Sequence, residues 1–269
     1  MLKNLQANIC FIGINNLSLA FMDCLIKKGL QKEKIQMIDS QVSYDEKIQK
    51  QKQIILKKAD IVILLLAPEN LKGTLMPLKK WLANKVIVSM MAGIDIATLS
   101  NLTGSKKVIR VISNPPVLTH SGTHVFITSQ EMNQLDKDLI EMLYTATGKV
   151  FWALSETQAD AIIALSGSGP AYFFYILDSM VKTGISLGLD KQFALELALQ
   201  AASGAVEMVR KTNVPPVDLC GKVTLNNGIT ESALRMFDLG NVSDDIRLAM
   251  KAAYYRSKEI TSEIIAEVR

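Results

Sequence analysis

The first half of the chain alternates short apolar runs with longer stretches whose apolar residues recur at helical spacing. The nearly continuous apolar run at residues 61–66 is typical of a strand buried on both faces of a parallel sheet. Strand alternating with helix predicts a doubly wound α/β sheet. The expected strands are 9–12, 34–38, 61–66, 86–89, 107–112, 123–128 and 149–153, with helices at 16–28, 44–58, 70–83, from 94 onward, and at 130–145.

After Trp152 the pattern changes to helical periodicity with almost no strand signal. Small residues dominate the stretch 194–205, which would let a neighbouring helix approach closely in a core or at a subunit interface. We therefore predict two domains, a nucleotide-binding α/β domain at 1–155 and an all-α domain at 156–269. The expected helices of the second are 171–189, 191–212, 231–239 and 243–268, broken at Gly167-Ser168-Gly169-Pro170, at Pro215-Pro216 and at 226–228.

Composition narrows the class of protein. The 269 residues are 49 % hydrophobic and 21 % charged, which are globular values. No apolar run approaches the ~20 residues of a membrane span, and no export signal is visible at the N-terminus. Three widely spaced cysteines form neither a metal-binding spacing nor a disulfide framework, so we expect no metal and a reducing, cytoplasmic location. The net charge is +4 and the lysine-rich segment lacks stacking aromatics, so we expect no nucleic-acid partner.

The first loop that could carry chemistry follows the first predicted strand. Its sequence, Gly13-Ile14-Asn15-Asn16-Leu17-Ser18, keeps only the first glycine of the dinucleotide fingerprint G-x-G-x-x-G. Gly13 would permit the tight bend, Asn15 would tolerate unusual backbone angles in place of the second glycine, and Ser18 is small enough to replace the third. The helix start at Asn16 and Leu17 still offers amides to a phosphate, so we expect a weakened dinucleotide site.

Asp39 ends the second predicted strand, where an acid can accept hydrogen bonds from the adenosine ribose and would repel a 2′-phosphate. This placement favours NADH slightly over NADPH. A helix cap or a turn former is an equally good interpretation of Asp39. Lys47 or Lys50 could instead reach a 2′-phosphate, although nothing in the sequence holds them there.

Two loops of the second half precede predicted helices. The Gly-Ser-Gly-Pro turn at 167–170 would present serine hydroxyls and free amides, and the loop 222–230 would present amides with Thr230 as cap, which suits a small carboxylate. Ordinary helix caps explain both loops as well. His120 and His124 lack carboxylate or cysteine neighbours in sequence, so we expect surface or structural histidines. The sequence has no nucleophile elbow and no phosphate-loop lysine.

In order and spacing, these segments resemble the pyrroline-5-carboxylate reductases, which catalyse the last step of proline synthesis. The stretch "ALSGSGPAYFF" is nearly identical to the most recognisable motif of that family, and "SMMAGI", "VIRVISNPPVL" and "VTLNNGIT" stand where its other motifs occur. The resemblance covers essentially the whole chain. It implies an N-terminal Rossmann-type domain, a helical C-terminal domain that forms an intertwined dimer, and in many members decamers built from such dimers.

The resemblance also implies a site. The substrate pyrroline-5-carboxylate would lie between the nicotinamide of NADPH or NADH and the loop 223–230. A hydride would pass from nicotinamide C4 to the imine carbon, while the Thr230 hydroxyl hydrogen-bonds the ring nitrogen and loop amides hold the carboxylate. The implied residues are Thr230 and Ser166 for catalysis; Ser168, Gly169, Asn227, Gly228 and Ile229 for substrate; and Gly13, Asn15, Asn16, Leu17, Asp39, Ala67, Pro68, Ala92, Gly93 and Asn114 for the cofactor.

Several positions depart from the family pattern. Leu225-Asn226-Asn227 replaces Ser-Pro-Gly, Ala67 stands where lysine is common, and Ser113 and Pro115 alter the Pro-Asn-Thr-Pro motif. The segment between Asp39 and residue 61 is short, so one strand of the sheet is expected to be absent. An active reductase is the leading hypothesis. A non-catalytic paralogue that binds ligand or partners is the second. A reductase for another small imine or keto acid is the third. The related 3-hydroxyacid dehydrogenases place a lysine one turn into the helix after their glycine loop, and this chain has Phe173 and Phe174 in that turn instead.

Overall fold

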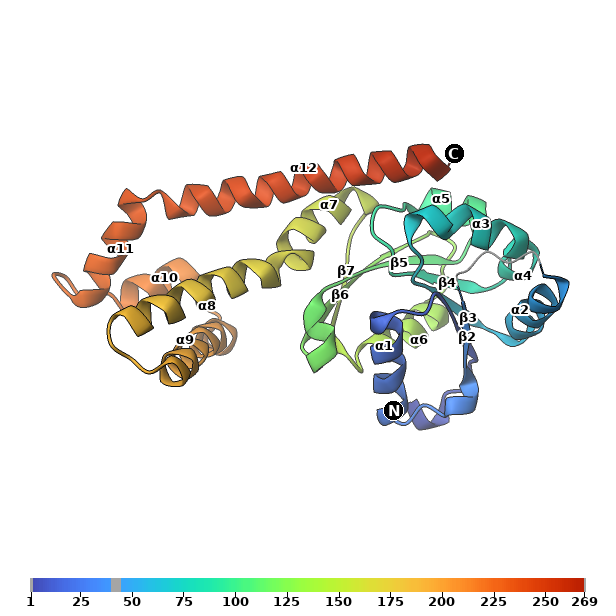
Figure 1. The fold of residues 1–269 in the computed structure, drawn as a ribbon, viewed down its shortest axis with the longest axis horizontal. Helices are drawn as coiled ribbons and strands as arrows, with labels where there is room; N and C mark the ends of the chain where they lie inside the picture. The colour runs from blue at the N-terminus through green and yellow to red at the C-terminus, as the bar shows by residue number, and fades with distance from the viewer. Residues whose placement is uncertain (1, 40–44, 269) are drawn as a thin grey trace. The chain divides into compact units, whose positions relative to one another are not determined.

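A computed structural model describes residues 2–39 and 45–268 of the chain. Its centre is a seven-stranded sheet in the order β2-β1-β3-β4-β5-β6-β7 (Figure 1). Neighbouring strands run parallel except β5 and β6, which are antiparallel. The α/β sheet predicted from the sequence is confirmed. The strands are Ile9–Ile12 (β1), Ile35–Ile38 (β2), Ile61–Leu64 (β3), Val86–Ser89 (β4), Val108–Ser113 (β5), Gly122–Thr128 (β6) and Gly148–Trp152 (β7).

Helices cover both faces of this sheet (Figure 1). Successive side chains of a strand point to opposite faces, so Phe11 of β1 joins the core layer under α1 and α6, while Ile12 joins the layer under α2, α3 and α5. The sheet is therefore doubly wound. Its helices are Asn16–Lys27 (α1), Glu46–Lys58 (α2), Leu71–Leu75 (α3), Lys79–Leu82 (α4), Ile96–Thr103 (α5) and Gln134–Tyr144 (α6), with 3-10 turns at Leu2–Asn4, Lys32–Lys34, Pro68–Asn70, Met76–Leu78 and Pro115–Thr119.

Two local differences from the predicted elements have simple causes. The helix expected at 70–83 is split into short pieces, because Pro77 lies in the 3-10 turn between α3 and α4 and cannot donate an interior helical hydrogen bond. The helix after β2 was expected to begin at residue 44, which lies outside the described residues. In the structure this helix, α2, begins after the Asp45 cap. Among described residues between Asp39 and Ile61, α2 is the one regular element, and β2 forms one edge of the sheet.

The chain forms two compact units, residues 2–168 with 253–268, and residues 169–252. The division by contacts therefore falls at Ser168 rather than at the expected 155/156. Three links explain the difference: Glu156 pairs with Arg110 of β5, Asn114 donates to the Ser166 carbonyl, and Ser257 donates to Asp160. The remaining elements are the 3-10 turn Glu156–Gln158, Ala159–Ile162 (α7), the π-helical turn Ile163–Gly167 (η7), Gly169–Ser186 (α8), Lys191–Thr212 (α9), Pro216–Lys222 (α10), Ile229–Leu239 (α11) and Val242–Val268 (α12).

Within the 169–252 unit, small residues bring α8 and α9 together. A Cβ atom at Gly184 would lie 3.2 Å from the Cβ atom of Ala194, and Ala194 and Ala198 are buried. The small-residue stretch of α9 therefore packs closely, as expected. Many larger apolar side chains of this unit remain exposed in the single chain, among them Phe173, Phe174, Tyr175, Met180, Phe193, Met236 and Phe237.

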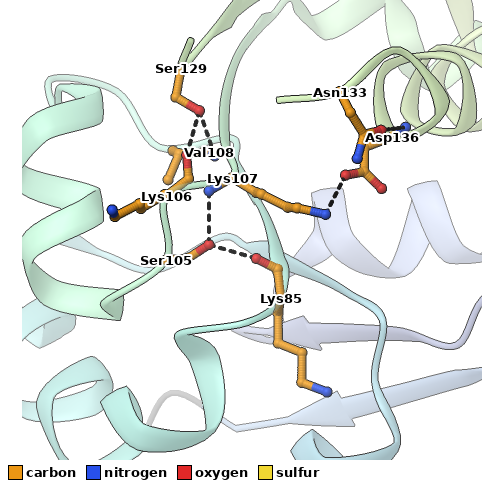
Figure 2. A network of polar contacts seen from close by, with 8 residues as sticks. All are labelled: Lys85, Ser105, Lys106, Lys107, Val108, Ser129, Asn133 and Asp136. Atoms are coloured by element: carbon orange, nitrogen blue, oxygen red, sulfur yellow. Dashed lines mark hydrogen bonds and ion pairs between the residues drawn. The ribbon is translucent and has the colours of Figure 1, made fainter. Parts of the chain in front are cut away.

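A polar network closes the amino-terminal end of β5 (Figure 2). The Ser105 hydroxyl donates to the Lys85 carbonyl at 2.7 Å and accepts from the Lys107 amide at 3.1 Å. Ser129 makes the equivalent pair of bonds to Lys106 and Val108, and Lys107 forms an ion pair with Asp136 at 2.8 Å. This end lies opposite the carboxyl ends of the parallel strands, so the network serves the sheet rather than a ligand.

Replacing Ser105 with alanine is expected to lower the free energy of unfolding by about 1–3 kcal/mol, because the Lys85 carbonyl and the Lys107 amide lose their partner beside a buried side chain. Urea denaturation measures this change. Ser262→Ala is the matched control, since that exposed hydroxyl only bonds back to a carbonyl one turn earlier in α12. Equal stabilities of the two variants would show that the network contributes nothing.

Candidate active site

The carboxyl ends of strands β1 to β5 meet along one edge of the sheet. The turns that follow these strands begin at Gly13, Asp39, Leu65, Met90 and Asn114. The strand order reverses between β1 and β3, and in open α/β sheets ligands bind in the crevice at such a switch point. The fold thus places the predicted cofactor residues along a single edge.

Gly13 lies directly at the switch point. Its φ is +107°, and a Cβ atom there would lie 2.3 Å from the carbonyl oxygen of Leu65, at the end of β3. The Gly13 amide donates to the Ile38 carbonyl at 3.0 Å, and the Leu65 amide donates to the Ile12 carbonyl at 2.9 Å. Three strand ends are therefore joined at a point where only glycine fits.

Asn15 has a different role from the one expected. Its φ of −148° and ψ of 175° are ordinary extended values, so the prediction that asparagine serves an unusual backbone angle is wrong. Instead, Asn15 caps α1: its side-chain oxygen accepts from the Ser18 amide at 2.9 Å, while the Ser18 hydroxyl accepts from the Asn15 amide at 2.9 Å. The two residues that replace fingerprint glycines form a reciprocal capping box, and Ser18 is buried as expected.

The capping box reduces what α1 can offer to a phosphate. The Ser18 amide is used by its own cap, whereas Asn16 and Leu17, the first two helical residues, have no carbonyl one turn earlier to bond. Their amides lie at the positive end of the helix dipole. The tight glycine turn and these two amides fit a dinucleotide pyrophosphate, with fewer donors than the full fingerprint supplies.

Asp39 is exposed at the end of β2, next to a lysine that the sequence analysis did not consider. Burial lowers the pKa of Lys52 on α2, and the nearby Asp39 charge partly opposes that lowering. Lys52 is 8 % exposed, while Lys47 and Lys50 lie at exposed positions of the same helix. Asp39 and Lys52 therefore place one acidic and one basic side chain near the end of β2.

The turns after β3 and β4 hold the next predicted residues. Ala67 is exposed, and Pro68 begins a 3-10 turn. Ala92 is exposed and lines two cavities of about 230 and 240 Å³. Gly93 is buried with a φ of +73°, which favours glycine, and a Cβ atom there would have to displace the end of the Ile264 side chain of α12.

Asn114, after β5, joins the sheet edge to the motif at 163–170. Its side-chain nitrogen donates to the Ser166 carbonyl at 3.1 Å, and its side-chain oxygen accepts from the Thr123 amide at 2.8 Å. Gly167 lines the 230 Å³ cavity, and Ser168 lines the 240 Å³ cavity together with Ala92 and Gly93. The structure thus brings Ala92, Asn114, Ser166 and Ser168 together.

The Gly-Ser-Gly-Pro stretch is not the helix break that the sequence predicted. Residues 163–167 form a π-helical turn that continues through Ser168 into α8, and the Ser168 amide donates to the Ile163 carbonyl at 2.9 Å. Because that amide is bonded within the helix, the hydroxyls of the half-buried Ser166 and Ser168 are the groups left for a ligand. Single π-helical turns occur frequently at functional sites.

The remaining predicted residues belong to the 169–252 unit, at the start of α11. Thr230 is not the helix cap: α11 begins at Ile229, and its cap is Gly228, which has no side chain to contribute. The Asn227 amide donates to the Glu231 carboxylate and the Gly228 amide to the Leu225 carbonyl, so Ile229, Thr230 and Glu231 supply the amides still free at this end. Asn227, Gly228 and Glu231 line a cavity of about 540 Å³, and Ile229 is 93 % exposed.

Gly169, the other predicted substrate residue of the 169–252 unit, is the first residue of α8 and is buried.

Arg110 is a buried residue at the site that the sequence analysis missed. It is 2 % exposed, its Nη1 atom lies 3.3 Å from Glu156, and its Nε and Nη2 atoms have no hydrogen-bond partner within the described residues. Glu156 also accepts from the Ile96 amide at 3.0 Å. A lone arginine inside an apolar strand was the available signal, since such a charge requires a buried partner.

The two histidines differ in environment. His124 is fully buried between Ser113 and Thr147, and desolvation lowers its pKa to about 4. His120 is exposed, and its Nδ1 atom lies 3.3 Å from the Cys24 sulfur.

Residues 2–39 and 45–268 contain no group of three or more His, Cys, Asp or Glu side chains that could hold a metal ion.

Comparison with known proteins identifies the family. A family model described as "Pyrroline-5-carboxylate reductase dimerisation" matches residues 156–260, and one described as "NADP oxidoreductase coenzyme F420-dependent" matches residues 8–93. The pyrroline-5-carboxylate reductase of Pseudomonas aeruginosa is 31 % identical, over 95 % of this chain and 97 % of its own length. That of Haemophilus influenzae is also 31 % identical, over 94 % and 97 %.

Solved structures agree with this assignment. The pyrroline-5-carboxylate reductase of Coxiella burnetii superposes with a TM-score of 0.84 at 29 % identity, covering 95 % of this chain and 99 % of that one. The Plasmodium falciparum pyrroline carboxylate reductase, solved with NADP bound, has the same fold, with a TM-score of 0.84 at 23 % identity over 97 % and 100 % of the chains. The chain belongs to the pyrroline-5-carboxylate reductase family.

Proposed function

We propose that this chain reduces pyrroline-5-carboxylate to L-proline with NAD(P)H. The observation that carries the proposal is the sheet edge at which the Gly13 turn, the two free amides of α1 and the Asn114–Ser166 link lie in one compact unit. The family similarity over the full chain supports it. The bound cofactor would supply the hydride, and the chain would bind and orient the two reactants.

We assign the residues as follows. Gly13, Asn16 and Leu17 hold the pyrophosphate, and Asn15 acts indirectly by capping α1. The Thr230 hydroxyl hydrogen-bonds the ring nitrogen, with Ser166 as a second polar contact. Asp39 contacts the adenosine ribose, and Ala67, Pro68, Ala92, Gly93 and Asn114 line the cofactor cleft, while Ser168, Gly169, Asn227, Gly228 and Ile229 contact the substrate.

Oxidation of NADPH and NADH in the presence of pyrroline-5-carboxylate, followed by absorbance, tests the proposal directly. Turnover with neither cofactor, in folded protein, would contradict it and favour the non-catalytic paralogue. Turnover only with other imines or keto acids would instead support a reductase for a different small substrate.

Replacing Thr230 with valine is expected to lower kcat by about 10²-fold, because one proton-donating hydroxyl is lost at the ring nitrogen. Thr230 is exposed in the first turn of α11 and does not cap it, so thermal unfolding should be unchanged. Thr183→Val is the matched control, since that exposed hydroxyl only bonds back to the Ser179 carbonyl within α8. An unchanged kcat in Thr230→Val would remove Thr230 from the mechanism.

Cofactor choice depends on the charges after β2. We propose that both dinucleotides are accepted, with a slight preference for NADH because the Asp39 carboxylate disfavours a 2′-phosphate. Lys52 reduces that preference, since its charge lies near Asp39. The ratio of the Michaelis constants for NADH and NADPH measures the balance.

We also propose that the 169–252 unit forms the family's intertwined dimer and that dimers assemble further into decamers in the cytoplasm. The dimerisation family model and the exposed apolar side chains of α8 and α9 support the dimer. Within the described residues one helical stretch, Glu156–Ser186, meets the length and hydropathy of a membrane span, which is weak evidence by itself. We assign its exposed apolar side chains to the subunit contact.

A further inference from the structure

A cavity of about 230 Å³ opens where β4 and β5 end, within the 2–168 part of the first unit. Its lining is mostly apolar, with the half-buried Ser113 as the one hydroxyl-bearing residue among those that line it. Ser113 stands where the family pattern has proline, so this hydroxyl is a property of this chain. The guanidinium of Arg110 also lines the cavity, and its Nε and Nη2 atoms have no hydrogen-bond partner within the described residues.

Behind Ser113 runs a chain of buried hydrogen bonds. The Ser113 hydroxyl lies 2.7 Å from Nδ1 of His124, and Nε2 of His124 lies 2.8 Å from the hydroxyl of Thr147. The Thr147 hydroxyl donates to the Tyr144 carbonyl at 3.1 Å. These hydrogen bonds connect β5, β6, the turn before β7 and the end of α6. The positions of the side chains are therefore held by the sheet and by α6 rather than by one loop.

The hydroxyl of Thr147 sets the direction that we assign to these bonds. With its one hydrogen donated to the Tyr144 carbonyl, this hydroxyl accepts from Nε2–H of His124, and we assign that tautomer. A neutral imidazole with hydrogen on Nε2 has a bare Nδ1, which accepts from the Ser113 hydroxyl. The Ser113 oxygen therefore keeps only lone pairs for anything in the cavity.

His124 is held in this neutral form by its surroundings. Its ring is fully buried, packs edge-on against Tyr144 with centroids 5.0 Å apart, and has a pKa well below neutrality because of desolvation. At neutral pH the imidazole therefore keeps Nδ1 free to accept from Ser113. The lining of the cavity thus combines a donor, the Arg110 guanidinium, with an acceptor, the Ser113 oxygen, which suits a ligand group that carries an N–H beside an acceptor oxygen.

We propose that Ser113 is a specificity-determining residue that accepts a hydrogen bond from a nitrogen-bound hydrogen of the ligand in this cavity, and that His124 is its positioning residue. The inference rests on the proposed function, which supplies two sources of that chemistry: the carboxamide of the nicotinamide ring, or the protonated ring nitrogen of the cyclic imine. A ligand group without an N–H would leave the Ser113 lone pairs without a hydrogen bond, even where its oxygen meets Arg110.

The first experiment titrates NADPH into wild type and Ser113→Ala by fluorescence, without substrate, and repeats both titrations with the 3-acetylpyridine analogue, whose methyl ketone lacks the N–H. If the carboxamide is the donor, Ser113→Ala weakens NADPH binding by about five- to tenfold and leaves the analogue unchanged. If the iminium is the donor, NADPH binding is unchanged and the Michaelis constant for pyrroline-5-carboxylate rises by about the same factor.

The second experiment changes His124. In His124→Asn the side-chain oxygen can still accept from Ser113, so ligand affinity should stay within about twofold of wild type. In His124→Phe the Ser113 hydroxyl is released, and the affinity should fall as far as in Ser113→Ala, with no further loss in the double variant. Ser129→Ala, in the network at the opposite end of β5, is the control for destabilisation without loss of affinity.

The outcomes separate this inference from the proposed function. Dinucleotide binding that is unaffected by Ser113→Ala, together with an unchanged Michaelis constant, overturns the role of Ser113 alone. Equal weakening of NADPH and of its analogue also overturns it, because the N–H would not matter. If wild type binds neither dinucleotide and does not turn over the imine, both proposals fail.

Discussion

Replacing Gly13 with alanine is expected to lower the free energy of unfolding by about 4 kcal/mol and to weaken dinucleotide binding at least about tenfold. A Cβ atom would lie 2.3 Å from the Leu65 carbonyl oxygen and 2.8 Å from its carbonyl carbon. Both contacts are with backbone, and Leu65 is held by its amide bond to the Ile12 carbonyl, so neither strand end can move away cheaply. The φ of +107° adds conformational strain for any residue with a side chain.

Loss of binding follows from the same geometry. The bend at Gly13 leads directly into α1, so displacing the turn also displaces the amides of Asn16 and Leu17 that we assign to the pyrophosphate. Urea denaturation measures the stability, and fluorescence titration with NADPH measures the affinity.

Two other glycines separate the contributions. Gly188 has a φ of +97° with nothing within 4 Å of an added Cβ atom, so Gly188→Ala should show the conformational cost alone, about 1–2 kcal/mol. Gly204 lies in the interior of α9 with nothing near an added Cβ atom, so Gly204→Ala should stabilise by roughly 0.5–1 kcal/mol. If Gly13→Ala loses no more free energy of unfolding than Gly188→Ala, the backbone of Leu65 moves away from the added Cβ atom without a measurable loss of stability.

Acidification is expected to destabilise the protein through His124. In the unfolded chain this histidine titrates near its ordinary pKa of 6.5, whereas burial lowers the pKa in the fold to about 4. Between these values the unfolded state binds more protons, so stability is full above pH 6.5 and is lost as the pH falls toward 4. The complete difference amounts to about 3 kcal/mol, of which about 2 kcal/mol should be lost by pH 5.

The test compares the free energy of unfolding at pH 7.5, 6 and 5 for wild type and His124→Asn. Asparagine does not titrate, so the variant should lose about 2 kcal/mol less than wild type between pH 7.5 and pH 5. Ser129→Ala, which removes hydrogen bonds at the other end of β5 without removing a titrating group, is the control and should keep the wild-type pH dependence. Parallel curves for wild type and His124→Asn would show that His124 does not become charged on unfolding in this range.

The sequence determined the succession of elements and the class of the fold. The predicted strand 86–89 and helix 191–212 coincide with β4 and α9, because their patterns depend only on which local positions are apolar. The bend at Gly13 was also visible, since glycine before an amphipathic helix is a local signal. The family motif at 164–174 identified the lineage of the whole chain.

Only the tertiary structure decided how the site is built. The π-helical turn at 163–167, the Arg110–Glu156 pair and the Ser113–His124–Thr147 chain were not predicted. Local patterns report whether a residue is buried, but the partner of a buried polar group comes from another segment, here 11 to 46 residues away for Ser113 and Arg110. Which segment that is depends on the order of strands in the sheet, and no spacing along the chain encodes it.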